Sequence, residues 1–351
     1  MDPKVFRPPP GQVLFRSLAD RDHESMSSIT DLSTAPREAT ISGAPGSQSN
    51  APVSSLALTS AAEKDSLLPD LLALAKIRLT AMVVITTAVG FILASPDTIH
   101  WFALLATALG TWMLAGSAAA LNQWLEIIPD SRMNRTRARP LPTGRLLPST
   151  ALLFAALTLI AGAILLLWGA NPLTALLGLA NLIIYAFIYT PLKRISSLNT
   201  LVGAICGAIP PMMGCTAATG TPGPPAYILA ALLFVWQIPH FLSLAWLYRD
   251  DYARAGFRML PIIDSTGRLT CRMIVLYSLL LIPVSLAACL FDIAGGWYGP
   301  ISIFLGLAMV FLAADMARNR TRQAARRVFL ASVAYLPLLL ILMVAGSSTS
   351  R

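Results

Sequence analysis

The stretch that decides the fold is WFALLATALGTWMLAGSAAALNQWLEIIPDSRMNRTRARPLPTGR, residues 101–145. It begins with a mostly apolar run, Trp101 to Leu121, which has the length of a helix that crosses a bilayer, about 20 residues. Asn122, Glu126 and Asp130 follow this run, and then come five arginines. An apolar segment that ends in carboxylates and arginines predicts a membrane-spanning helix with a polar site at one membrane surface.

The composition of the whole chain supports this interpretation. Of its 351 residues, 56% are hydrophobic and only 12% are charged, and the mean hydropathy is +0.66. A soluble domain carries about 25% charged residues, so we predict a polytopic membrane protein. The net charge of +9 lies in short loops between apolar segments, which argues against a nucleic-acid partner.

Nine apolar segments are long enough to cross a membrane as helices. They are longer than the strands of a membrane barrel and lack the period-2 alternation of such strands. We therefore predict an all-α polytopic membrane protein with about nine transmembrane helices. The predicted segments are 76–95, 101–125, 150–169, 172–190, 200–218, 226–247, 272–291, 298–316 and 328–347.

The first 65 residues differ from the rest of the chain. They are rich in Ser, Ala, Pro and Thr and have no apolar period, so we predict a disordered cytoplasmic tail at 1–65 and a transmembrane domain at 66–351. The tail lacks the apolar core of a signal peptide, and its acidic residues, such as Asp20 and Glu24, are unlike a transit peptide. This favours a bacterial cytoplasmic (inner) membrane, with the mitochondrial inner membrane as the alternative.

The distribution of lysine and arginine predicts the orientation. The loops after predicted segments 2, 4, 6 and 8 carry these residues, whereas the loops after segments 1, 3, 5 and 7 carry none. Lys76 and Arg78, at the start of the first segment, lie on the basic side. Because positive loops stay inside, the N-terminus is predicted to be cytoplasmic and the C-terminus to lie outside.

A first acidic site is predicted at the cytoplasmic end of the second segment. Asn122, Glu126 and Asp130 are spaced i, i+4 and i+8, which places them on one face of a continuous helix. Pro129 is expected to end that helix near Ile128 and to leave Asp130 on the first turn of the loop. Two carboxylates and an amide suit Mg²⁺ together with substrate phosphate oxygens. The alternative is simple ion pairing of the carboxylates with Arg132, Arg135 or Arg139.

A second acidic site is predicted in WLYRDDYARAGFRMLP, residues 246–261, on the same side of the membrane. Asp250 and Asp251 there make a two-metal clamp on a single diphosphate possible. The alternative is a solvated loop in which Arg249 and Arg254 pair with the acids.

Several basic residues are candidates for phosphate contacts. Arg135 and Arg139 suit bidentate phosphate binding. Lys193 and Arg194, in YTPLKRISSLNT at 189–200, suit the charge that develops on a diphosphate leaving group. All four also fit simple positive-inside markers.

Three other features within the apolar segments stand out. His240 is an intramembrane ionisable residue and therefore a functional candidate, with helix packing as the alternative. Gly203 and Gly207 form a GxxxG pattern, for which close helix packing is the favoured interpretation. The cysteines lie in or beside apolar segments without metal-binding spacing and are expected to be small buried hydrophobic residues; they are Cys206, Cys215, Cys271 and Cys289.

These motifs resemble the UbiA superfamily of intramembrane prenyltransferases, in the form of its heme O synthase (protoheme IX farnesyltransferase) branch. Asn122 to Asp130 with Met133, Arg135, Thr136 and Arg139 are similar to the first Asp-rich motif. YTPLKR (189–194) and GAIPPMMG (207–214) resemble the middle segment, and WQIPHF (236–241) and RDDYARAGFRMLP (249–261) the second motif. The resemblance spans roughly residues 70–345 and leaves out the first 65.

The resemblance implies nine helices around a cavity open to the membrane, in which farnesyl diphosphate is transferred to a vinyl group of heme b with addition of water, giving heme O and diphosphate. It implies Mg²⁺ as cofactor, with heme A synthase or terminal oxidase assembly factors as further partners. Competing interpretations are a prenyltransferase for an aromatic quinone precursor, a membrane transporter, and a scaffold for oxidase assembly.

The resemblance also implies roles for individual residues. Mg²⁺ would be held by Asn122, Glu126, Asp130, Asp250 and Asp251. The diphosphate would be bound by Arg135, Arg139, Tyr189, Lys193, Arg194 and Arg249. The catalytic set would be Asn122, Glu126, Asp130, Lys193, His240 and Asp251, with His240 binding the heme iron or lying near the vinyl group. Aromatic candidates for stabilising an allylic cation are Trp124, Tyr185, Tyr189, Trp236 and Phe241.

Overall fold

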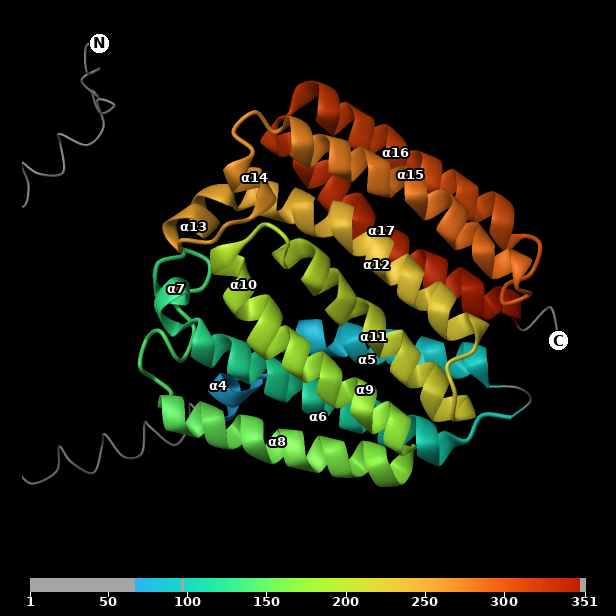
Figure 1. Cartoon of the computed structure of the whole chain (residues 1–351), viewed down its shortest axis with the longest axis horizontal. Coiled ribbons are helices and arrows are strands. Elements are labelled where there is room, and N and C mark those ends of the chain that lie inside the picture. Colours follow the sequence, from blue (N-terminus) through green and yellow to red (C-terminus); the bar gives the residue numbers. More distant parts are fainter. Residues whose placement is uncertain (1–66, 96–97, 348–351) are drawn as a thin grey trace, which may run out of the picture. The chain divides into compact units, whose positions relative to one another are not determined.

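The computed structural model describes residues 67–95 and 98–347, and within them the chain is helical with no strand (Figure 1). Nine of its helical stretches are long and apolar enough to cross a membrane. They are α5 (Ile77–Ala94), α6 (Trp101–Leu125), α8 (Pro148–Gly169), α9 with η1 and α10 (Pro172–Ile195), α11 (Asn199–Thr219), α12 (Pro224–Leu247), α15 (Arg268–Leu290), α16 (Tyr298–Asn319) and α17 (Arg322–Ser347).

The predicted fold class is therefore confirmed, and each long helix begins and ends within a few residues of its predicted limits except where polar residues extend it. The largest difference is at α17, which begins at Arg322, whereas the apolar pattern predicted a start near residue 328. Arginines 322, 326 and 327 form its first turns because they have good helix propensity and long stems. The predicted tail at 1–65 lies outside the described residues, and its boundary with the transmembrane domain stays a prediction.

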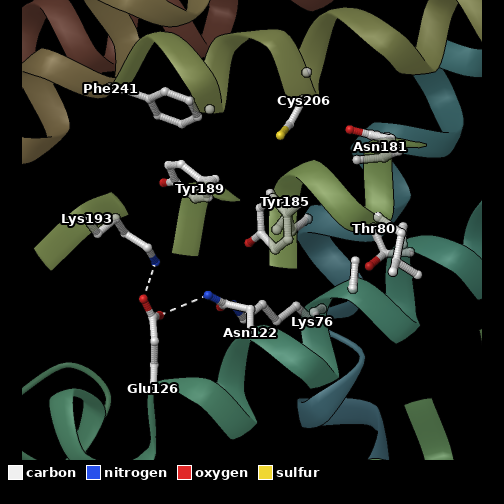
Figure 2. A pocket seen from close by; sticks show the side chains of 18 of the residues that line it. Lys76, Thr80, Asn122, Glu126, Asn181, Tyr185, Tyr189, Lys193, Cys206 and Phe241 are labelled. Atoms are coloured by element: carbon white, nitrogen blue, oxygen red, sulfur yellow. Dashed lines mark hydrogen bonds and ion pairs between the residues drawn. The ribbon is translucent and has the colours of Figure 1, made fainter. Parts of the chain in front are cut away.

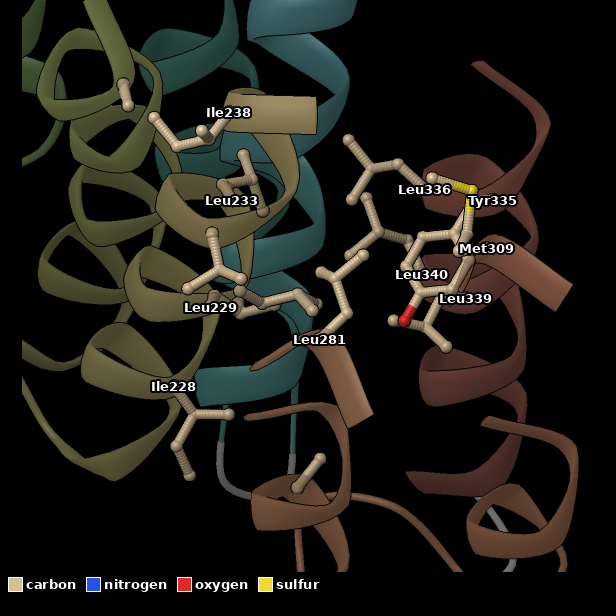
Figure 3. Packing of buried hydrophobic residues seen from close by; sticks show 14 of the residues in the cluster. Ile228, Leu229, Leu233, Ile238, Leu281, Met309, Tyr335, Leu336, Leu339 and Leu340 are labelled. Atoms are coloured by element: carbon tan, nitrogen blue, oxygen red, sulfur yellow. The ribbon is translucent and has the colours of Figure 1, made fainter. Parts of the chain in front are cut away.

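The long helices pack around several apolar clusters, two of which form the cores of groups of helices. One core lies between α12, α15, α16 and α17, where Leu229, Leu281 and Leu339 are fully buried (Figure 3). The other joins α6, α8, α9 and α11 through Leu114, Leu166 and other buried residues. α11 packs against both α5 and α12 and so connects the two groups.

The outward faces of the helices are apolar as well. Trp168 is 84% exposed, and Phe102, Phe304 and Phe311 are exposed to a similar degree. Such a density of large exposed hydrophobic side chains is typical of a surface that faces lipid.

The backbones of α5 and α11 approach each other closely at two glycines. A Cβ added to Gly214 would lie 1.8 Å from the carbonyl oxygen of Thr87, and one added to Gly90 would lie 2.2 Å from that of Pro211. The predicted GxxxG glycines have a different use. Gly203 and Gly207 make room for side chains, the ring of Tyr189 and the amide of Gln237.

Short helices collect at one end of the long ones. α7 (Ile127–Ser131), α13 (Arg249–Arg254) and α14 (Leu260–Ile263) lie at the same end of the described part of the chain as α10 (Figure 1). A small apolar cluster that includes Met133, Tyr252 and Phe257 joins the segment after α7 to the segment around α13. The two acidic motifs are therefore brought to the same end of the helices.

Candidate active site

A cavity of about 350 Å³ lies between α5, α6, α9, η1 (Ile184–Tyr189), α10 (Thr190–Ile195), α11 and α12. At one end its wall carries charged side chains, including those of Glu126 and Lys193 (Figure 2). Further in, the lining is mainly apolar, with residues such as Leu114, Leu182 and Phe241. The cavity therefore has a charged end and a long apolar interior.

Glu126 is at the centre of the charged end. The Lys193 ammonium lies 2.5 Å from Glu126 Oε1, and both side chains are less than 10% exposed. The angles of this contact do not satisfy a hydrogen bond, so it is an ion pair. Asn122 Nδ2 donates a hydrogen bond to Glu126 Oε2 over 3.0 Å. A buried pair of this kind is held only while both charges are present, because a single charge left in an apolar interior is costly.

Asn122 connects this pair to a residue that the sequence interpretation left out of the site. Lys76 Nζ donates to Asn122 Oδ1 over 2.6 Å, and Asn122 Nδ2 also donates to Thr190 Oγ1 over 3.0 Å. Lys76 adopts a left-handed backbone conformation, with φ 48°, just before α5. Its ammonium group is thereby part of the cavity wall (Figure 2).

Burial around the Lys76 ammonium, with repulsion from Arg139 as the next cause, lowers the pKa of Lys76 to about 7. Desolvation favours the neutral amine here, because the Lys76 nitrogen donates to the uncharged amide of Asn122 rather than to a carboxylate. In the sequence, Lys76 is only a single lysine ahead of an apolar segment. The positive-inside rule accounts for such a lysine without any role in a site.

Asp130 is 1% exposed and is also directed into the cavity wall. Arg139 Nη1 donates to Asp130 Oδ2 over 2.6 Å, so one of the ion pairs expected as the alternative to metal binding is present. Asp130 Oδ1 is buried and has no hydrogen-bond partner among the described residues. The helix break comes at Glu126 rather than near Ile128, because Pro129 lies in the first turn of α7, where its missing N–H is not needed.

The π-helical turn η1 brings two tyrosines to the cavity. Tyr185 and Tyr189 both line it, with 5.4 Å between their ring centroids. The Lys193 ammonium lies 4.9 Å from the Tyr189 ring centroid. π-Helical turns are rare and occur frequently at functional sites, and no pattern in the sequence predicted this one.

Arg135 links the two acidic motifs. It donates from Nη2 to the Tyr252 hydroxyl over 3.1 Å and lies 5.0 Å from the ring centroid of Tyr248 and 5.4 Å from that of Tyr252. Arg135, Arg139 and Tyr252 all line the cavity. These contacts hold two segments more than 100 residues apart against the same charged end.

The carboxylates of the second motif are placed differently. Asp251 is largely buried and pairs with Arg254, and neither is part of the cavity lining. Asp250 has a side chain that is 84% exposed and lines a separate surface depression. Within residues 67–95 and 98–347, no three side chains of His, Cys, Asp or Glu converge as a metal site. The structure thus unites the two motif segments but not their four carboxylates.

Other predicted site residues also lie outside the cavity lining. Arg194 is exposed, and Arg249 is exposed beside Trp246 and Asp250. His240 contacts α17 rather than the cavity. Of the aromatic candidates, Trp124 and Trp236 are not part of the lining, whereas Phe241 is.

Three polar side chains line the cavity without hydrogen-bond partners. Thr111 Oγ1, Asn181 Oδ1 and Gln237 Oε1 are buried and unpaired within the described residues. Figure 2 shows Asn181 well away from Glu126. Buried amides without partners are rare in folded proteins, so these groups are candidates for contacts with a substrate or with water.

The charged end has the donor set of a magnesium site. Asn122, Glu126 and Asp130 offer amide and carboxylate oxygens, which Mg²⁺ prefers, and Mg²⁺ usually completes its shell with water and substrate phosphate. The unpaired Oδ1 of Asp130 is the specific feature that favours a cation. These residues fit a Mg²⁺ site in which diphosphate oxygens supply the remaining ligands.

Comparisons with known proteins agree with this geometry. The model of the UbiA prenyltransferase family matches residues 83–338. A protein of Solibacter usitatus named protoheme IX farnesyltransferase is 43% identical over 283 residues, which cover 78% of this chain and 97% of that protein. The human mitochondrial protoheme IX farnesyltransferase is 43% identical over 278 residues, 79% of this chain and 62% of the human protein.

A solved structure has the same fold. The structure of a UbiA homologue from Archaeoglobus fulgidus bound to DMAPP and Mg²⁺ aligns with a TM-score of 0.62, over 80% of this chain and 98% of that one, at 16% sequence identity.

Proposed function

This chain belongs to the UbiA prenyltransferase family, and we propose that it is a protoheme IX farnesyltransferase, which transfers the farnesyl group of farnesyl diphosphate to a vinyl group of heme b with addition of water. The products are heme O and diphosphate. The identity of 43% over almost the full length of the Solibacter usitatus relative supports this reaction. The single structural observation that carries it is the buried cluster of Asn122, Glu126 and Lys193, joined by the half-buried Lys76, at one end of an apolar cavity.

The cavity matches the two parts of a prenyl diphosphate. Its apolar interior suits a 15-carbon chain because burial of each CH₂ group contributes about 0.8 kcal/mol. Its charged end suits the diphosphate, since Lys76, Arg135, Arg139 and Lys193 all line it. One substrate is therefore bound with its head at Glu126 and its tail between the helices.

The charged end favours departure of the diphosphate. As the bond between C1 of the farnesyl group and the diphosphate oxygen breaks, the electron pair leaves with the diphosphate. Lys193 and Lys76 are fixed by Glu126 and Asn122 before the reaction begins. Preorganised cations stabilise the developing charge without reorganisation, which is the main source of rate in many enzymes.

Magnesium fits the same step. Asn122, Glu126 and Asp130 would hold Mg²⁺, which when bound supplies Lewis-acid stabilisation of the diphosphate oxygens. Asp251 joins this set only by giving up its ion pair with Arg254. The A. fulgidus homologue, whose structure contains Mg²⁺ and DMAPP, supports a divalent metal in this family.

The aromatic and amide groups serve the later steps. The rings of Tyr185 and Tyr189 stand between the charged end and the interior and stabilise an allylic cation by about 0.5–2 kcal/mol each. The outer vinyl carbon of heme b bonds to C1 of the farnesyl group. Water then adds its oxygen to the inner vinyl carbon and loses one proton. Asn181 and Gln237 are the unpaired amides in the lining that can hold that water.

The location follows from the fold. The nine apolar helices within residues 67–95 and 98–347 make this a multi-pass membrane protein. We place it in a bacterial inner membrane with the charged end on the cytoplasmic side, because the basic loops lie at that end. A mitochondrial inner membrane is the alternative, as in the human relative.

Pigment extraction tests the proposed reaction. The protein is expressed in a host that makes heme b but no heme O, and hemes and quinones are separated by chromatography and mass spectrometry. Heme O is expected with the wild type and is absent with the empty vector. A prenylated aromatic ring without heme O would identify a quinone-precursor enzyme and overturn the proposal.

A further inference from the structure

The apolar interior of the cavity has a definite far end. Away from the charged end, the last residue that lines it is Thr111 on α6, Gly178 on α9 and Met213 on α11. Immediately after Met213, α11 meets the backbone of α5, since a Cβ added to Gly214 would lie 1.8 Å from the carbonyl oxygen of Thr87. No prenyl chain can pass between α5 and α11 there, so this contact closes the far end of the cavity on that side.

Two side chains from different helices form a wall at this end. A Cβ added to Gly178 would lie 2.6 Å from Leu114 Cδ1 and 3.0 Å from Met213 Cε, so the ends of these two side chains fill the space that the glycine leaves. Leu114 is 3% exposed and Met213 is 2% exposed. Leu166 of α8, which is fully buried and does not line the cavity, packs behind them. We call Leu114 and Met213 the end wall.

The depth of the cavity up to the end wall matches a farnesyl group. Along α6, Leu114 lies about 18 Å from Glu126, at about 1.5 Å per residue. An extended chain advances about 3.3–3.6 Å for every three bonds, so the main chain of a farnesyl group, from C1 to its last carbon, spans about 13 Å. The difference of about 5 Å between these two lengths is left for the diphosphate.

A fourth isoprene unit would overrun the end wall. It lengthens the extended chain by about 4–5 Å, so the end of a geranylgeranyl group would have to pass Leu114 and Met213 and reach the level of Thr111, about one turn further along α6. Thr111 Oγ1 is buried and has no hydrogen-bond partner within the described residues. Apolar carbon packed against this hydroxyl would leave it unpaired, which is unfavourable. Both steric contact and polarity therefore oppose a chain of twenty carbons.

We propose that Leu114 and Met213 determine the chain length of the prenyl donor, and that Gly178 provides the space for the ends of their side chains. This inference rests on the proposed function, because that function names the fifteen-carbon donor. Without an end wall, a longer chain would bind more tightly, since each further CH₂ group buries more apolar surface. The end wall reverses this order and selects farnesyl over geranylgeranyl diphosphate.

The proposal also gives a role to the motif GAIPPMMG, residues 207–214. Its last two residues act together, because Gly214 brings α11 against α5 and Met213 lines the cavity just before that contact. The motif thereby closes the end of the cavity that lies away from the diphosphate.

Binding of three donors of different length tests this assignment. Purified protein in detergent with Mg²⁺ is titrated with geranyl, farnesyl and geranylgeranyl diphosphate in the absence of heme. The wild type is expected to bind farnesyl diphosphate about tenfold or more tightly than geranylgeranyl diphosphate. Met213→Ala shortens the end wall and should bind geranylgeranyl diphosphate at least as tightly as farnesyl diphosphate. Its affinity for geranyl diphosphate should be unchanged, because that chain ends before the wall, and reports that the variant is folded.

Gly178→Ala should act in the opposite direction. The atoms nearest to its new Cβ are the ends of flexible side chains, and Leu166 packs behind Leu114 and Met213, so these two side chains move into the cavity. The affinity for farnesyl diphosphate should fall about tenfold or more, whereas the affinity for geranyl diphosphate should be unchanged.

Met309→Ala is the matched control for Met213→Ala. Met309 is 1% exposed in the core between α12, α15, α16 and α17 and does not line the cavity. The same substitution there removes the same atoms from a buried place, so it should leave the ratio of the farnesyl and geranylgeranyl affinities as in the wild type.

Two results would overturn the assignment. One is a wild type that binds farnesyl and geranylgeranyl diphosphate equally well, and the other is a preference that neither Met213→Ala nor Gly178→Ala changes. Leu114→Ala shortens the same end wall from α6 and takes the place of Met213→Ala should that variant fail to bind geranyl diphosphate. A wild type that does not bind farnesyl diphosphate at all would instead count against the proposed reaction, which the length preference does not test because no acceptor is present.

Discussion

The Lys193 ammonium and the Glu126 carboxylate form a buried ion pair, 2.5 Å apart, that joins α10 to the end of α6. Both side chains are buried, and burying either charge without the other would be costly in free energy. The pair explains how charged groups can be buried at one end of a bundle of otherwise apolar helices. It also makes each partner sensitive to the loss of the other.

Replacement of Glu126 by Gln should abolish most of the activity. The substitution removes a carboxylate from the donor set and leaves Lys193 without its counter-charge, so heme O formation is expected to fall by roughly 100-fold or more. Heme O is measured by mass spectrometry of membrane extracts. Asp315→Asn is the matched control, because Asp315 pairs with Arg327 at an exposed place far along the chain, and surface pairs of this kind contribute about 0–1 kcal/mol. Full activity of Glu126→Gln would favour a scaffold instead of an enzyme.

Lys76 should determine affinity for the diphosphate. Lys76→Gln removes an amine that donates to Asn122 and that is a cation in its protonated form, and is expected to raise the Kd for farnesyl diphosphate about tenfold, which corresponds to about 1.4 kcal/mol. Lys76→Arg keeps the charge and should restore part of the affinity. The measurement is equilibrium binding of radiolabelled farnesyl diphosphate to purified protein.

Arg78→Gln is the control for Lys76. Arg78 follows two residues later and is exposed, so its loss should leave this Kd unchanged. Equal effects at the two positions would mean that Lys76 acts only through general surface charge.

Tyr189 should act through its ring rather than its hydroxyl. Tyr189→Leu is expected to lower kcat by about 2- to 30-fold, from the loss of about 0.5–2 kcal/mol of cation–π stabilisation, whereas Tyr189→Phe should stay close to the wild type. Steady-state kinetics with farnesyl diphosphate and heme b provide the comparison. A defect in Tyr189→Phe as large as that in Tyr189→Leu would show that the hydroxyl group is what matters.

The contact between α5 and α11 should tolerate no side chain at Gly214. A new Cβ there would meet the backbone of Thr87, and the helices must separate to admit it, so we expect Gly214→Ala to cost about 1–3 kcal/mol or more in stability. Thermal unfolding in detergent measures this loss. Gly116→Ala is the control, because its nearest neighbour, the Ala75 side chain, is 3.8 Å away, and its unfolding temperature should not change. Equal stability of the two variants would contradict the close packing.

The sequence predicted the fold more fully than the site, for physical reasons. Runs of about 20 apolar residues are long enough to cross a membrane as helices, so the nine long helices of the described residues could be predicted from hydropathy. Asn122, Glu126 and Asp130 could be predicted because their local spacing brings them together where α6 ends and α7 begins. The helix break was predicted near Ile128 but lies at Glu126, because Pro129 falls in the first turn of α7 rather than at the end of α6.

The remaining contacts depend on tertiary structure. Lys76 reaches Asn122 from 46 residues away through a left-handed turn, and Tyr252 meets Arg135 across 117 residues. No local sequence pattern can predict contacts between residues so far apart in the chain. The π-helical turn that carries Tyr185 and Tyr189 has no composition signature, and the pairing of Asp251 with Arg254 is a choice among several nearby cations.

The central claim is that the buried cluster around Glu126 and Lys193 transfers a farnesyl group to heme b. The most direct measurement combines purified protein in lipid nanodiscs with farnesyl diphosphate, heme b and Mg²⁺, and quantifies heme O and diphosphate over time. We predict equal amounts of the two products with the wild type, and roughly 100-fold less of both, or lower still, with Glu126→Gln. Diphosphate release without heme O, or heme O formation by Glu126→Gln at a rate close to that of the wild type, would contradict the claim.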